Sequence, residues 1–181
     1  MNGFGIVLKA LKNLFGSADG REAVRPLYQA LIAEARAPHW YEQGAVADTI
    51  DGRFDMLNAV LALTLVRMEA LGDEARLSST LLAETFVEDM DGQLREIGIG
   101  DIIVGKHIGK MMGALGGRLG AYRSAFEKGG DPREALVRNL YRGQVPATEA
   151  LDHVTARLRR FAGGLETLTL DQLLAGRIAP A

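Results

Sequence analysis

The stretch Leu57-Asn-Ala-Val-Leu-Ala-Leu-Thr-Leu-Val66 decides the fold. It lies within the segment Asp51–Leu71, which contains no proline and has a single glycine near its beginning. A helix that is apolar on almost every side is normally buried among other elements. We therefore expect Asp51–Leu71 to form a central, buried helix.

The composition of the chain favours helices throughout. Its 181 residues suit one domain with a real core, and alanine and leucine are abundant while only 5 prolines occur. The absence of cysteine excludes disulfides, thiolate zinc sites and cysteine nucleophiles. The net charge of -2 argues against bulk nucleic-acid binding. We predict an all-α, single-domain helical bundle of about six to eight helices.

Apolar periodicity and turn signals place the other helices. A segment around Trp40, from Pro38 to Gly44, is expected to be a loop or short turn. Leu77, Leu81, Leu82, Phe86, Met90 and Leu94 are predicted to face inward on the helix that follows the central one. The expected ranges besides the central helix are Asp19–Ala35, Asp73–Ile97, Asp101–Lys128, Asp131–Tyr141, Thr148–Phe161 and Leu170–Ala175.

The first residues have a character of their own. Between Phe4 and Phe15, apolar residues share one helical face and Lys9 and Lys12 take the other. Such a basic amphipathic helix suits contact with a membrane surface or a partner, although an ordinary terminal helix covering the core has the same pattern. We divide the chain into this segment, 1–18, and a single helical domain, 19–181. No run is apolar enough for a membrane span and no clear signal peptide is present, so a cytoplasmic location is expected.

A row of glycines marks the helix predicted for Asp101–Lys128. Each glycine costs about 0.8–1 kcal/mol relative to alanine in a helix interior, so the row needs a reason. Tight packing inside the protein is one explanation, and a groove for a foreign helix is another. The row consists of Gly105, Gly109, Gly113, Gly116 and Gly120.

Two acidic blocks, residues 48–55 and 86–101, contain the remaining candidates for chemistry. Carboxylates of Asp51, Asp55 and Asp89 on facing helices would be suitable ligands for magnesium and a diphosphate, as in an all-α prenyl-transfer enzyme. The alternative is an architectural role, in which Arg53 and Arg95 neutralise nearby carboxylates. The histidines His39, His107 and His153 are scattered along the sequence, and none has the spacing of a metal site.

The same blocks carry a resemblance to a known family. Asp48-Thr-Ile-Asp-Gly-Arg-Phe-Asp55 and Met90-Asp-Gly-Gln-Leu-Arg-Glu-Ile-Gly-Ile-Gly-Asp101 occur in order after Trp40-Tyr41, and Val104-Gly-Lys106 follows. Together they resemble the ubiquinol–cytochrome c chaperone family, here a bacterial member. The motif residues expected to hold the structure are Asp48, Asp51, Gly52, Arg53, Asp55, Asp89, Asp91, Arg95, Glu96 and Asp101.

The resemblance implies a non-enzymatic assembly factor without a cofactor or metal. It would bind newly made cytochrome b, at the cytoplasmic face of the membrane, and promote assembly of the ubiquinol–cytochrome c reductase complex. Mitochondrial members work near the ribosomal tunnel exit, so a ribosome is a further expected partner. A membrane-associated structural adaptor without chaperone activity is the third hypothesis. The expected client contacts are Trp40, Tyr41, Phe54, Lys106, Met112 and Tyr122.

Overall fold

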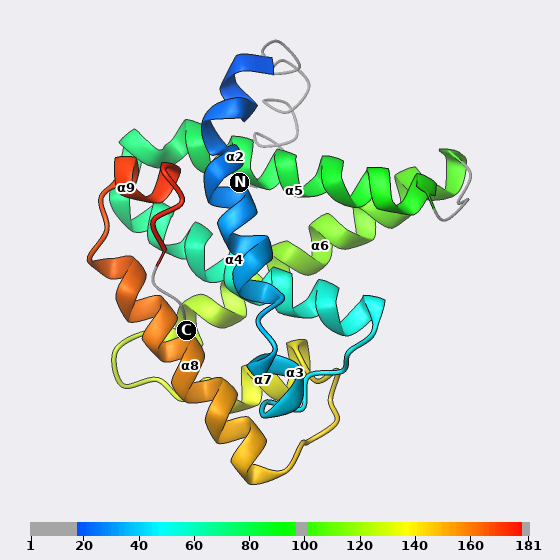
Figure 1. Cartoon of the computed structure of the whole chain (residues 1–181), viewed down its shortest axis with the longest axis vertical. Coiled ribbons are helices and arrows are strands. Elements are labelled where there is room, and N and C mark those ends of the chain that lie inside the picture. Colours follow the sequence, from blue (N-terminus) through cyan, green and yellow to red (C-terminus); the bar gives the residue numbers. More distant parts are fainter. Residues whose placement is uncertain (1–17, 97–100, 179–181) are drawn as a thin grey trace, which may run out of the picture.

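The computed structural model describes residues 18–96 and 101–178, and that part of the chain is all-α with no strand. The prediction of a helical bundle is confirmed. Figure 1 shows the helices crossing one another around α4 at the centre. In chain order they are α2 (Ala18–Ala35), α3 (His39–Glu42), α4 (Ile50–Leu71), the 3-10 turn η1 (Gly72–Ala75), α5 (Arg76–Glu96), α6 (Asp101–Phe126), α7 (Arg133–Asn139), α8 (Thr148–Glu166) and α9 (Leu170–Leu174).

Helix α4 is the centre of the core, as its sequence predicts. Every residue from Asp55 to Leu65 is buried, and α2, α5, α6 and α8 all pack against the helix. The Thr49 hydroxyl caps its first turn by accepting a hydrogen bond from the Gly52 amide at 3.1 Å. At the other end Gly72, with a φ of 81°, turns the chain into η1. A positive φ is easily adopted only by glycine, so the helix ends there.

Several elements differ in detail from the sequence-based expectations. Residues 72–75 form a 3-10 turn, so α5 begins at Arg76 and buries Ala75 just before it, while Leu77 is 57% exposed instead of facing inward. The chain around Trp40 contains one turn of helix, α3. Helix α8 continues past Phe161 to Glu166, because its last turn places Leu165 in the core.

In Figure 1 the end of α5 and the beginning of α6 lie close together at the right, and the two helices diverge from there, α6 running back to pack against α4. The α6 residues that face the body include Leu115 and Tyr122, which are buried in the common core. None of the described helices is long and apolar enough to cross a membrane. The predicted N-terminal segment, 1–18, lies outside the described residues except for Ala18, the first residue of α2.

Candidate functional site

The first acidic block builds an ion-pair network around the buried carboxylate of Asp55. We call it the arginine cluster, and it consists of Asp51, Asp55, Arg118 and Arg142. Asp55 of α4 is completely buried, and its two carboxylate oxygens accept hydrogen bonds from Arg118 of α6 and from Arg142 Nε, the latter at 2.5 Å. Arg142 also reaches Asp51 at 2.7 Å. The hydrogen bond to Asp55 raises the pKa of Arg142 above its ordinary value. The cluster therefore ties α4, α6 and the chain after α7 together.

Two unusual backbone positions, Arg142 and Gly52, lie in or beside the cluster. Arg142 adopts a φ of 53°, which is uncommon for a residue with a side chain. Gly52 lies in the first turn of α4, where an added Cβ would be 1.9 Å from the carbonyl oxygen of Ala47. The glycine in this block is thus required for the chain before α4 to pass close to the helix.

The prediction that Arg53 pairs with a nearby carboxylate is confirmed, but that carboxylate is Asp48 and the buried Asp55 has other partners. Arg53 pairs with Asp48 at 2.6 Å on the surface, and its guanidinium lies 5.8 Å from the centre of the Tyr41 ring. Arg118 and Arg142, which are distant in sequence, neutralise Asp55 instead. The side chains of the motif residues Arg95, Glu96 and Asp101 lie outside the described residues.

The magnesium hypothesis loses its ligands in this arrangement. Asp51 and Asp55 are held by arginines, whereas Asp89 accepts a hydrogen bond from the Tyr28 hydroxyl of α2 at 2.7 Å. Burial and this hydrogen bond raise the pKa of Tyr28. Among the described residues, no group of three or more histidine, aspartate or glutamate side chains could hold a metal ion. The carboxylates of the two blocks serve as structural partners.

Two of the predicted contact residues are core residues. Trp40 and Tyr122 are both 0% exposed. The Trp40 indole donates a hydrogen bond to the Glu34 carbonyl at 2.8 Å, and the Tyr122 ring packs edge-on against Phe126. Their aromatic rings contribute to packing in this structure, so the expectation that they form an exposed contact surface needs correction.

The other predicted contacts do not form one patch. Tyr41 is half-buried and donates a hydrogen bond to the Ala35 carbonyl at 2.6 Å, and Phe54 is half-buried against Phe86. Met112 is half-buried on α6, and the side chain of Lys106 lies outside the described residues. A contact surface built from this set stays a prediction.

The glycines of α6 have a different setting from the tight internal packing that we considered first. We define the glycine face as Gly109, Gly113, Gly116 and Gly120. All four are exposed, and an added Cβ at any of them would meet no other atom within 4 Å. Tyr122, which is buried, lies about two and a half helical turns after Gly113 and therefore on the opposite side of α6. The glycine face thus points away from the core. Packing among the described residues therefore does not explain these glycines.

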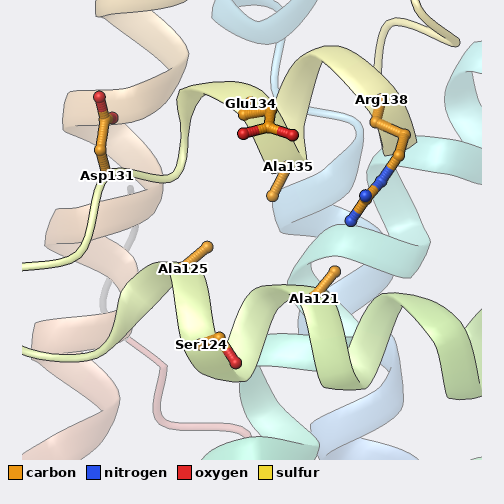
Figure 2. Close-up of a pocket in the computed structure, with 7 residues that line it drawn as sticks. All are labelled: Ala121, Ser124, Ala125, Asp131, Glu134, Ala135 and Arg138. Carbon is orange, nitrogen blue, oxygen red and sulfur yellow. The ribbon is translucent and has the colours of Figure 1, made fainter.

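Small side chains continue along α6 beyond the glycine face. Figure 2 shows Ala121, Ser124 and Ala125 lining one side of a shallow pocket, with Glu134 and Arg138 of α7 on the other. The pocket has a volume of about 370 Å³. Ser124 follows Gly120 by one helical turn, so the open strip of small residues reaches the edge of this pocket.

One cluster was missed at the sequence level. His39 of α3 and His153 of α8 appear unrelated in the sequence, yet Nδ1 of His39 lies 3.1 Å from Nε2 of His153. No local spacing could have revealed this pair, because packing of α3 against α8 brings the two rings together.

The fold and these sites define the class as an all-α protein with a charged internal scaffold and an open glycine face. The model of the family described as ubiquinol–cytochrome C chaperone matches residues 42–180, and the chain belongs to this family. The crystal structure of the Cbp3 homolog from Brucella abortus matches with a TM-score of 0.77 and 29% identity, covering 97% of this chain and 96% of that chain. The comparison with curated proteins finds no match.

Proposed function

We propose that this ubiquinol–cytochrome c chaperone binds newly made cytochrome b and promotes its assembly into the ubiquinol–cytochrome c reductase complex. Membership of the family supports the assembly role. The open glycine face of α6 supports a helical client and is the observation that carries the proposal.

The energetic argument compares glycine with alanine. Four glycines in a helix interior cost about 3–4 kcal/mol relative to four alanines, at about 0.8–1 kcal/mol each. The glycine face has space for every missing methyl group, so no contact within the described chain repays this cost. A partner that packs directly on the bare backbone would repay this cost. Alanine could not replace glycine in such a contact, because each added Cβ would hold the partner further away.

A membrane helix fits this surface by its chemistry. Helices in membranes pack through small residues, which allow the two backbones to approach closely. Glycine-rich faces make contacts through van der Waals packing and do not require one particular side chain opposite them. The face therefore suits the hydrophobic helices of cytochrome b before they find their final neighbours.

The proposed location is the cytoplasmic face of the membrane, with the amphipathic segment 1–18 as a peripheral contact. This location follows from the client, which is a membrane protein. The magnesium-dependent enzyme is not favoured, because arginines hold Asp51 and Asp55. A purely structural adaptor would share the location and differ only in having no effect on cytochrome b.

Site-specific photocrosslinking in cells tests the contact. A photoreactive residue at position 113 or 120 should crosslink to cytochrome b. The same residue at position 149 or 160 of α8, both exposed, should not. Equal crosslinking from α6 and α8, or crosslinking from α8 alone, would contradict a client site on the glycine face.

A matched pair of substitutions tests the consequence. Gly113→Leu blocks the glycine face, and Gly163→Leu is its control, because Gly163 is an exposed glycine of α8 with nothing within 4 Å of an added Cβ. We expect Gly113→Leu to lower the membrane content of haem b and of assembled reductase, while Gly163→Leu leaves both unchanged. Normal reductase in the Gly113→Leu strain would argue against the proposed function.

A further inference from the structure

The hydrogen bond between His39 and His153, which we call the histidine joint, links the single turn of α3 to α8. Its two ring nitrogens are 3.1 Å apart and the rings meet edge to face, with centres 5.3 Å apart. Both rings are half-buried. At neutral pH one ring donates its N–H and the other accepts with its unprotonated nitrogen.

The histidine joint lies at the edge of a closely packed contact. The His39 ring centre is 4.3 Å from that of Trp40, which is 0% exposed. Two residues beyond α3, an added Cβ on Gly44 would lie 2.5 Å from a methyl group of Val154 and 2.6 Å from the Trp40 carbonyl oxygen. The chain after α3 therefore lies directly on α8, and the histidine joint closes this contact on the solvent side.

The charges around the histidine joint oppose its protonation. Arg157, one turn after His153 on α8, acts on both rings. The acidic neighbours offer little compensation: Asp152 is bound by Arg133 at 2.7 Å, and Glu42 of α3 and Glu149 of α8 are exposed to solvent. A proton added to the joint thus meets a positive neighbour.

We infer that the histidine joint is a proton-sensitive contact that holds α3 on α8 and opens when both rings are protonated. One proton leaves an imidazolium that still donates to its neutral partner. A second proton turns both nearest nitrogens into donors with no acceptor between them, beside the guanidinium of Arg157. Two cationic rings at this separation repel each other, and moving α3 away from α8 relieves the repulsion.

The direction of the pH effect follows from burial. Burial lowers the pKa of His39 and of His153, and Arg157 lowers both further. The unfolded chain therefore takes up these protons at a higher pH than the folded chain does. The stability that the histidine joint contributes is complete above about pH 6.5 and is lost as the pH falls below that value.

Trp40 is the sole tryptophan, so its fluorescence reports on this contact directly. Urea unfolding and acrylamide quenching of Trp40 are to be measured on the full chain between pH 7.5 and 5.0. We compare wild type with the double variant His39→Gln/His153→Gln, whose amides stay neutral. His107 remains in both proteins, so its own titration cancels from the comparison.

For wild type we expect the unfolding equilibrium constant to rise below pH 6.5, by up to about tenfold per pH unit for each extra proton bound by the unfolded chain. Quenching of Trp40 should increase over the same range, and both changes should be smaller in the double variant. Parallel pH profiles for the two proteins would overturn the inference.

A second variant keeps the test valid if the double variant fails to fold. Arg157→Gln removes a positive charge from the surroundings of both rings, so the folded chain accepts protons closer to the pH at which the unfolded chain does. The loss of stability between pH 6.5 and 5.0 should become smaller in this variant. An unchanged or larger loss would contradict a proton-sensitive histidine joint.

Discussion

The arginine cluster and the glycine face lie on opposite sides of the same helix, α6. One side is charged and packed, and the other is bare. On one side Arg118 enters the core, where it and Arg142 donate hydrogen bonds to the carboxylate of Asp55. On the other side, Gly109 to Gly120 expose backbone to open space. The charged side is closed by contacts within the chain, while the bare side meets no other part of residues 18–96 and 101–178.

The difference separates charges that serve the structure from a surface that is available to a partner. Carboxylates and arginines look like chemistry in a sequence, but in the arginine cluster each is already bonded to another. A glycine looks like an absence of chemistry, yet a row of exposed glycines is unfavourable for the helix that contains it. Binding is therefore to be sought on the glycine face.

The largest effect is expected from Asp55→Ala. Removing this carboxylate leaves the side chain of Arg118, which is 11% exposed, as an unpaired buried charge. Breaking a buried pair in this way destabilises a protein by about 3–5 kcal/mol. Urea unfolding of the purified variant measures the change. Asp48→Ala, which removes a carboxylate from an exposed pair, is the control and should behave nearly as wild type.

A loss of under about 1 kcal/mol in Asp55→Ala, comparable with an exposed pair, would remove the contrast between the two regions. It would mean that solvent or another carboxylate compensates for the missing charge of Asp55.

Gly52→Ala is expected to have the next largest effect. Alanine favours a helix over glycine by about 0.8–1 kcal/mol, but here its methyl group would lie 1.9 Å from the backbone oxygen of Ala47. The backbone must shift to avoid this overlap, and overpacking typically costs about 1–3 kcal/mol. We expect net destabilisation in urea unfolding. A variant as stable as wild type would show that the chain before α4 can move without loss.

Gly113→Ala makes the same substitution in the open region and should have the opposite sign. The added methyl group meets nothing within 4 Å, so only the helix preference remains. The free protein should gain about 0.8–1 kcal/mol of stability. Crosslinking to the client should nevertheless weaken, because the methyl group separates the two backbones. Gly163→Ala on α8 should give a similar gain with unchanged crosslinking.

A Gly113→Ala variant that is destabilised would show that α6 packs against another part of this chain through the glycine face. Greater stability with unchanged client binding would move the contact to a different surface.

The smallest effect is expected from Arg53→Ala. Its partner Asp48 holds the guanidinium in place and raises the pKa of Arg53, but both side chains are more than half exposed. Exposed pairs are weakened by solvent and salt, so urea unfolding should hardly change. A loss approaching that of Asp55→Ala would show that the cation over the Tyr41 ring belongs to the buried scaffold.

Several features could be predicted from local sequence alone. The apolar run Leu57–Val66 identified the buried central helix, and glycine at position 72 marked its end. The two acidic blocks identified the family, since their order and spacing are specific. These features depend on residues close together in the chain, where helical periodicity and turn preferences act.

The tertiary structure decided which residues meet and which remain open. Asp55 finds Arg118 and Arg142, and His39 finds His153, across separations that no periodicity encodes. It also placed Trp40 in the core and left the glycines of α6 exposed. The sequence determined the helices, their apolar faces and the family, because these follow from local spacing. Helix packing alone decided ion-pair partners and free surface, because both depend on which faces come into contact.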